Sequence, residues 1–189
     1  MGAITAVEDY LIARVKADAL GQKLRAVESL PGVWDAATLS QVLKSMPGVF
    51  ISFLGGSGGP SGNHTAALES RWTVYAVTGH ASGQAARRRG DGREIGAYEI
   101  LERLVPLLHG HTIPDYGTLK LTDISNLFTD GADFRGVALY GATFTLPLAF
   151  PPVLDASALD DFTTFGAAYD LAPPDGKADA EDQVTGLNL

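Results

Sequence analysis

Residues 69–78 read Glu-Ser-Arg-Trp-Thr-Val-Tyr-Ala-Val-Thr, and the rest of the chain is organised around this stretch. Successive side chains of a strand point to opposite faces. Here both faces are largely apolar or aromatic, with Trp72, Val74 and Ala76 on one and Thr73, Tyr75 and Val77 on the other. β-Branched and aromatic residues suit a packed, pleated surface. The pattern predicts an interior strand that helices cover on at least one side.

Other apolar runs can supply the rest of a sheet. Gly48–Leu54 precedes the interior strand, and Leu24–Ser29 is a weaker candidate for a short edge strand. Leu119–Phe128 and Val137–Phe150 follow it. The turn at Gly131–Gly136 predicts that these last two runs form an antiparallel hairpin.

Helices are predicted where apolar side chains recur at helical spacing. Three segments show this pattern: Thr5–Leu20, Asp35–Ser45 and Glu94–Leu108. Thr5 and Glu8 have the spacing of a capping box, and Pro106 predicts a kink or an end near Val105. The chain is therefore expected to be an α/β (α+β) protein with helices packed on a mixed or antiparallel central sheet.

The charges of the chain divide it into two parts. Pro151 and Pro152 close an α/β body, predicted as one domain over residues 1–154, with a net charge of −1. Residues 155–189 carry eight acids and one base, a net charge of −7. This acidic C-terminal extension is expected to be partly disordered or to dock on a partner.

Composition excludes several classes of function. The chain has no cysteine, which rules out disulfides, thiolate chemistry and cysteine-based metal sites. A net charge of −8 disfavours direct nucleic-acid binding. No apolar run reaches the roughly 18–20 residues that cross a bilayer. Met1–Tyr10 lacks the features of a signal peptide, so we expect folding in a cytoplasm and no membrane partner.

Two polar segments beside the interior strand, Gly55–Asn63 and Gly79–Arg93, are predicted to be flexible loops. The second holds the strongest charge feature, three consecutive arginines and a fourth nearby. Such a cluster contacts an acidic protein surface or nucleic acid, or is simply solvated; the overall charge favours an acidic partner. The candidate interface residues, with two acids of the extension, are Arg87, Arg88, Arg89, Arg93, Asp170 and Asp175.

Two motifs hint at chemistry without completing a site. Ser57 lies in a Gly-x-Ser-x-Gly sequence, but no helical pattern follows to form a nucleophile elbow. His109 and His111 could bind a metal with Asp115, although a polar loop is the better interpretation. We therefore expect no enzyme activity, no catalytic residue, no bound metal and no cofactor.

The order of these parts resembles a known family. A helix ends before Pro-Gly-Val (47–49) and a strand; a Gly-rich loop follows, and then Arg-Trp-Thr-Val-Tyr-Ala-Val (71–77). Later come Gly-Ala-Tyr-Glu-Ile-Leu-Glu-Arg-Leu (96–104) and Tyr-Asp-Leu-Ala-Pro-Pro-Asp-Gly (169–176). Over most of its length the chain is similar to the Mu-like phage tail terminator (tail completion) family.

The resemblance implies a structural role without catalysis. Such proteins form a homohexameric ring on the head-proximal end of the tail tube. The ring stops growth of tube and sheath and presents a surface to the head–tail connector. The implied partners are further copies of the chain, tube, sheath and connector proteins, and the implied location is the virion tail after assembly in the bacterial cytoplasm.

Three alternatives remain open on the sequence. The chain could be another head–tail joining or tail-tube-like protein, because these share α/β ring-forming bodies. It could be a small serine hydrolase that uses Ser57. It could also be a nucleic-acid-binding module that uses Arg87–Arg89, in which case DNA binding would depend on salt.

Overall fold

The computed structural model describes residues 2–30, 36–59, 65–79, 83–127, 136–152, 164–170 and 176–185. The chain forms two compact units, Met1–Pro152 and Val153–Leu189. We call the first the sheet unit and the second the hairpin unit, and each is described by itself. No helix in the described ranges is long and apolar enough to span a membrane.

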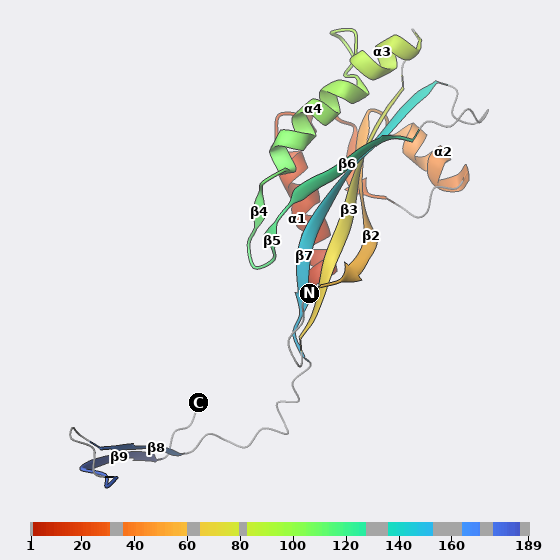
Figure 1. The fold of residues 1–189 in the computed structure, drawn as a ribbon. Coiled ribbons are helices and arrows are strands. Elements are labelled where there is room, and N and C mark those ends of the chain that lie inside the picture. The colour runs from red at the N-terminus through yellow and green to blue at the C-terminus, as the bar shows by residue number, and fades with distance from the viewer. Residues whose placement is uncertain are drawn as a thin grey trace. The chain divides into compact units, whose positions relative to one another are not determined.

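A five-stranded mixed sheet forms the centre of the sheet unit, in the order β1-β2-β3-β7-β6 (Figure 1). β1 is parallel to β2, and the other neighbours are antiparallel. The strands are β1 (Ala26–Ser29), β2 (Gly48–Gly58), β3 (Ala66–Gly79), β6 (Lys120–Asn126) and β7 (Val137–Phe150). The predicted interior strand is β3, at the middle of the sheet, and the predicted hairpin is the β6–β7 pair. A small separate sheet joins β4 (Thr112–Ile113) to β5 (Gly117–Thr118).

Within its described residues, the sheet unit also has four α-helices and one 3-10 turn: α1 (Ala3–Ala17), η1 (Gly21–Lys23), α2 (Ala36–Lys44), α3 (Gln84–Arg89) and α4 (Ala97–Leu108). The three predicted helices are present, with shifted ends. α1 begins before Thr5, with Gly2 at its N-cap, so the predicted capping box is wrong. Pro106 lies in the last turn of α4 without ending it near Val105, and the helix continues to Leu108.

Both predicted loops contain regular structure. β2 continues through Gly58, because Ser57 and Gly58 stay paired with β3. Gly56 makes this possible: a Cβ there would lie 2.3 Å from the carbonyl oxygen of Glu69. The second loop contains α3, whose alanines and arginines favour a helix. Residues 60–64 and 80–82 lie outside the described residues.

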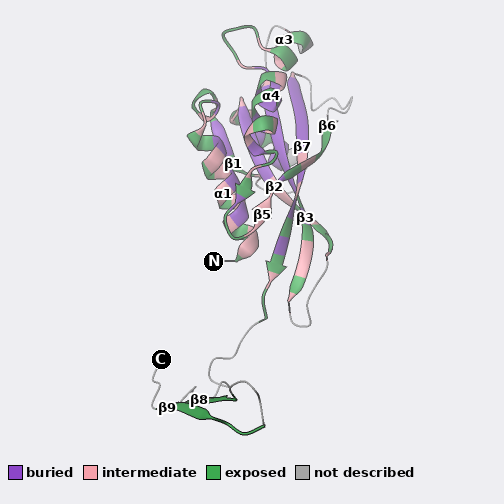
Figure 2. Cartoon of the chain, turned by 60° about the vertical axis from the view of Figure 1, so that its left-hand side comes forward, coloured by how far each residue is buried: buried purple, intermediate pink, exposed green. Residues whose placement is uncertain are grey.

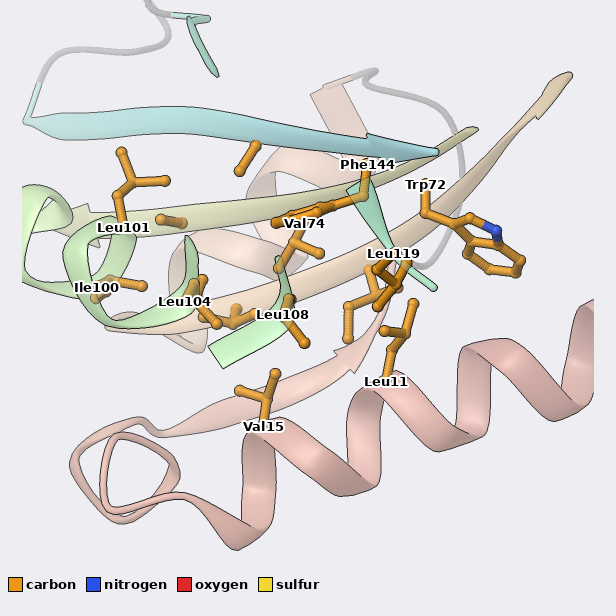
Figure 3. Packing of buried hydrophobic residues seen from close by; sticks show 14 of the residues in the cluster. Leu11, Val15, Trp72, Val74, Ile100, Leu101, Leu104, Leu108, Leu119 and Phe144 are labelled. Atoms are coloured by element: carbon orange, nitrogen blue, oxygen red, sulfur yellow. The ribbon is translucent and has the colours of Figure 1, made fainter. Parts of the chain in front are cut away.

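The main core lies between one face of the sheet and the helices α1 and α4 (Figure 3). Trp72 and Val74 of β3 are fully buried there, as the alternation predicts. Helix side chains that pack against this face include Leu11, Val15, Ile100, Leu104 and Leu108. Burying one such aliphatic side chain contributes roughly 1.5–3 kcal/mol, so this layer positions both helices.

The opposite face of the sheet is only partly covered. A smaller cluster joins Tyr75 and Val77 of β3 to Val42 of α2. Further along β3 the same face carries exposed Glu69 and Arg71, and the hydroxyl groups of Thr73 and Thr143 lie 2.9 Å apart. Burial therefore falls along β3 from Val77 toward Ala66, and in Figure 2 the purple of the strands gives way to pink and green at the end away from α4.

A row of polar contacts holds α1 against α4 and the residues that follow it. The hydroxyl of Tyr10 lies 2.9 Å from Nε2 of His111, and Arg14 Nε donates to the Leu107 carbonyl at 3.2 Å. At the end of the row, Arg103 donates to both carboxylate oxygens of Asp18, at 3.0 and 2.7 Å. The residue numbers of these partners increase along α1 while they decrease along α4, so the two helices run antiparallel.

The ion pair at the end of this row makes stability depend on pH. The Arg103 hydrogen bonds, and then the backbone N–H of Leu20, lower the pKa of Asp18 from 3.8 to about 2. A carboxyl with a lowered folded-state pKa stabilises the fold above its unfolded pKa, and this contribution is lost as the pH falls from about 4 to about 2.

Replacing Asp18 with Asn is expected to lower the free energy of unfolding by about 0.2–1 kcal/mol at pH 7. The value is modest because the Arg103 side chain is 58% exposed. Urea unfolding at pH 7 and at pH 2.5 measures it, and the difference from wild type should shrink at the lower pH, where part of the contribution is already lost. Glu102→Gln, an exposed position on α4, is the matched control. A difference that persists unchanged at pH 2.5 would contradict the assignment.

Candidate interaction surfaces

The two chemical motifs have structural roles. Ser57 lies in β2, exposed and paired with Glu69, and the next element is the strand β3. A nucleophile elbow needs a strand, a sharp turn and a helix, so this arrangement does not form one. His109 accepts a hydrogen bond at Nδ1 from the Leu121 N–H at 3.0 Å.

His111 packs against Tyr10 with the two rings stacked 5.8 Å apart. Burial, and then the charge of Arg14, lowers the pKa of His111, which favours its neutral ring. Asp115 is in a left-handed backbone conformation, with φ of 68°. Across the described part of the chain, no three His, Asp or Glu side chains gather in a way that could hold a metal ion.

The predicted arginine cluster forms the last turn of α3. Arg88 and Arg89 are exposed, whereas Arg87 is half-buried and its carbonyl accepts a hydrogen bond from the Thr78 hydroxyl at 2.7 Å. That bond fixes α3 at the end of β3. Three cations in the last turn also suit the negative end of the helix dipole. The cluster is therefore built into a short helix rather than carried on a loop.

Arg88 lies beside a pair of tyrosines. Tyr98 and Tyr140 pack edge to face with their hydroxyl groups 3.4 Å apart. The hydrogen bond from the Tyr140 hydroxyl lowers the pKa of Tyr98, and the neighbouring Arg88 adds to the effect. Burial is the main cause that raises the pKa of Tyr140. This pair joins α4 to β7 directly beneath the arginines.

A groove of about 600 Å³ opens at the same end of β3. Three exposed cations line it: Lys23 and Arg25 from the segment that leads into β1, and Arg93 from the segment before α4. Half-buried apolar side chains form another part of its wall: Leu43, Met46 and Ile95. We call this feature the basic groove.

Two acids also line the basic groove. The Glu99 carboxylate accepts the Gly96 N–H at 3.2 Å and so completes the cap of α4, and Glu94 is exposed. Within the described residues, none of the three cations forms an ion pair. Their side chains are therefore available to an incoming acidic group.

The basic groove brings together one predicted site residue, Arg93, with two that sequence reasoning missed, Lys23 and Arg25. No local pattern marks those two, because isolated basic residues are common on protein surfaces. Arg87–Arg89 lie near the groove, because Gly136 lies between Arg87 and Gly79, which lines the groove. A Cβ added to Gly136 would be 3.9 Å from the Arg87 guanidinium, and a Cβ added to Gly79 would be 3.4 Å from the Gly136 carbonyl oxygen. This end of the sheet unit is thus rich in cations.

The hairpin unit is a structure that the sequence did not predict. β8 (Thr164–Tyr169) and β9 (Ala180–Thr185) form an antiparallel pair. Of the two predicted acids, Asp170 follows β8 and its carboxylate accepts the Gly176 N–H at 2.9 Å, while Asp175 lies outside the described residues. Regular strand pairing thus occupies part of the extension that is predicted to be partly disordered or to dock on a partner.

Comparison with known proteins decides the family. The family model for bacteriophage Mu Gp37 matches residues 3–149. The chain belongs to the bacteriophage Mu Gp37 family. This match confirms the resemblance to Mu-like tail terminators. It ends one residue before the end of β7, so the family model covers the sheet, with its helices, and not the hairpin unit.

Two relatives of this Gp37 family member are similar over most of its length. It is 32% identical over 155 residues to the protein named "Probable tail terminator protein" of Escherichia phage Mu, covering 82% of this chain and 80% of the relative. It is 30% identical over 186 residues to the Mu-like prophage FluMu protein gp37 of Haemophilus influenzae, covering 98% and 90%. The second alignment therefore includes most residues of the hairpin unit.

Proposed function

We propose that this chain is a tail terminator, a structural protein that forms a ring on the head-proximal end of a phage tail tube and stops its growth. The observation that carries the proposal is the similarity to the probable tail terminator of phage Mu over four-fifths of both chains. The proposed partners are further copies of the chain, tube and sheath proteins and the head–tail connector. The proposed location is the virion tail, after assembly in the bacterial cytoplasm.

The surfaces of the chain suit a ring. A head-to-tail contact joins one surface of a copy to a different surface of the next copy. Repeated contacts close into a ring when the rotation between neighbouring copies is a whole-number fraction of a full turn. The cation-rich end of the sheet unit and the acidic residues 155–189 are two such surfaces. Opposite charges orient the copies and speed their association more than they raise affinity. A closed ring that fits the tube on one side only would end polymerisation.

Deleting the gene in the phage or prophage that encodes it tests the proposal. We expect tail tubes of uncontrolled length without heads, seen by negative-stain electron microscopy, and normal length when the chain is supplied in trans. The purified protein should also show the mass of one discrete closed oligomer, a hexamer, by light scattering. Normal tails with heads attached in the deletion strain would contradict the proposal.

The same experiment separates the alternatives. Loss of a head–tail joining protein would leave tubes of normal length without heads, and loss of a tube-like protein would leave no tubes. The hydrolase alternative receives no support from Ser57, which lies in a strand with no following helix. We also propose that the chain is not an enzyme; esterase activity that Ser57→Ala abolishes without loss of tail assembly would favour the hydrolase instead.

A further inference from the structure

We propose that the basic groove of one copy binds the acidic β8–β9 hairpin of a second copy. This inference rests on the proposed ring and names the two surfaces that would meet in it. It follows from the exposed apolar face of the hairpin, its charge and the composition of the groove.

The hairpin exposes an apolar face. Cross-strand partners in an antiparallel pair point to the same side, and alternate residues share a face. The register pairs Phe165 with Val184 and Tyr169 with Ala180, so all four side chains lie on one face. Phe165, Tyr169 and Val184 are 50%, 45% and 49% exposed. A large exposed apolar patch marks an interaction site.

An isolated two-stranded hairpin is marginally stable in water and is stabilised by packing against another surface. The partner must also accept negative charge. Asp182 is paired with Ala167 and therefore lies on the apolar face itself. Glu181 lies on the other face, and Asp170 and Asp179 flank the strands. The surface that fits this hairpin is apolar with cations at its edge.

The basic groove has this composition. Its wall combines the apolar side chains of Leu43, Met46 and Ile95 with three exposed cations. Its volume of about 600 Å³ is in the range of pockets that enclose small ligands, roughly 300–1,000 Å³. It can therefore receive one or two aromatic side chains of the hairpin while the cations face Asp182 and its neighbours.

A second copy is the occupant that a ring requires. The hairpin and the groove are different surfaces, so contact between copies is head-to-tail and leaves one groove and one hairpin free for the next copy. Residues 155–189 also carry a net charge of −7, which repels other acidic surfaces and favours a cation-lined site.

Cysteine crosslinking tests the contact directly, because the chain has no cysteine of its own. Two full-length variants of different tagged mass are mixed and oxidised, one with Lys23→Cys in the groove and the other with Ala180→Cys on the hairpin. We expect a disulfide-linked heterodimer. Ala149→Cys is the matched control: Ala149 is exposed and lies at the other end of the sheet from Gly79, and it should not crosslink with the Ala180→Cys variant.

Charge reversal supplies a second test, in which recovery of association in a mixture shows that weak association of each variant alone is not caused by a folding defect. Arg25→Glu with Arg93→Glu, or Glu181→Lys with Asp182→Lys, should each weaken association by about tenfold or more, because like charges would then meet. Mixing the two double variants should restore association between them. Failure of the mixture to recover, with both variants folded by circular dichroism, overturns the proposal.

Other occupants give different outcomes. A disulfide within one chain that carries both cysteines, with no crosslink between chains, would show that the hairpin binds its own copy. A gel shift of duplex DNA that disappears with Arg25→Glu and Arg93→Glu, with no crosslink, would assign the groove to nucleic acid. Either result overturns the proposal.

The readouts separate this inference from the proposed function. Light scattering measures ring closure, and crosslinking measures docking. A discrete hexamer without the Lys23–Ala180 crosslink would overturn the docking and leave the ring. A crosslinked pair that never closes into a ring would support the docking and contradict the ring.

Discussion

Replacing Trp72 with Ala is expected to lower the free energy of unfolding by about 3–5 kcal/mol, the usual cost of removing a large buried aromatic side chain. Trp72 is fully buried in the main core, and its ring lies 5.0 Å from that of Phe53. Its indole N–H donates to the Ser70 hydroxyl at 2.9 Å, and that hydroxyl donates to the Leu146 carbonyl. The substitution removes packing and one buried hydrogen bond together.

Urea unfolding at pH 7 measures this loss as a lower midpoint urea concentration, while the dependence of the unfolding free energy on urea concentration stays unchanged. Leu54→Ala is the control on the neighbouring strand β2. Leu54 is 45% exposed, and its truncation is expected to change stability by no more than about 0.5 kcal/mol. If Trp72→Ala cost no more than Leu54→Ala, the assignment of Trp72 to the main core would be wrong.

Replacing Gly96 with Ala is expected to cost about 1–3 kcal/mol through overpacking. A Cβ at this position would lie 2.1 Å from the Gly90 nitrogen and 2.4 Å from the carbonyl carbon of Arg89. These are backbone atoms, which cannot turn aside as a side chain can. The φ of Gly96 is −93°, which alanine adopts freely, so the whole cost arises from the collision.

The collision should also loosen α3, because Gly96, at the start of α4, packs against the backbone of Arg89 and Gly90 at the end of α3. We expect trypsin to cut the Gly96→Ala variant faster after Arg87, Arg88 and Arg89 than it cuts wild type. Gly58→Ala is the control, since nothing lies within 4 Å of its added Cβ, and it should match wild type in both assays. Equal cleavage of all three proteins would show that α3 does not depend on this contact.

The layers of the sheet unit could be predicted from local patterns. Alternation in residues 69–78 placed Trp72 and Val74 on one face and Tyr75 and Val77 on the other, and both faces are buried at the α2 end of the strand. The apolar stripe of Glu94–Leu108 identified α4. Such patterns work because burial repeats with the period of the element that carries it.

The errors occurred in segments whose glycines or polar and charged residues are typical of loops. Glycines around Ser57 indicated a loop, yet β3 continues alongside and pairs with them, and Gly56 permits the close approach. The segment before Arg93 also indicated a loop, yet it holds α3. The β8–β9 pairing was missed because most of its residues are polar, small or acidic.

Local sequence patterns and composition were enough to predict the sheet, its covering helices, the absence of cysteine chemistry and the separation of an acidic end from a nearly neutral remainder. These features follow from residue type and short-range spacing. The folded structure was needed to show that Lys23, Arg25 and Arg93 line one groove and that Phe165, Tyr169 and Val184 share one face. Those neighbours are set by strand order and register, which bring together residues far apart in the chain.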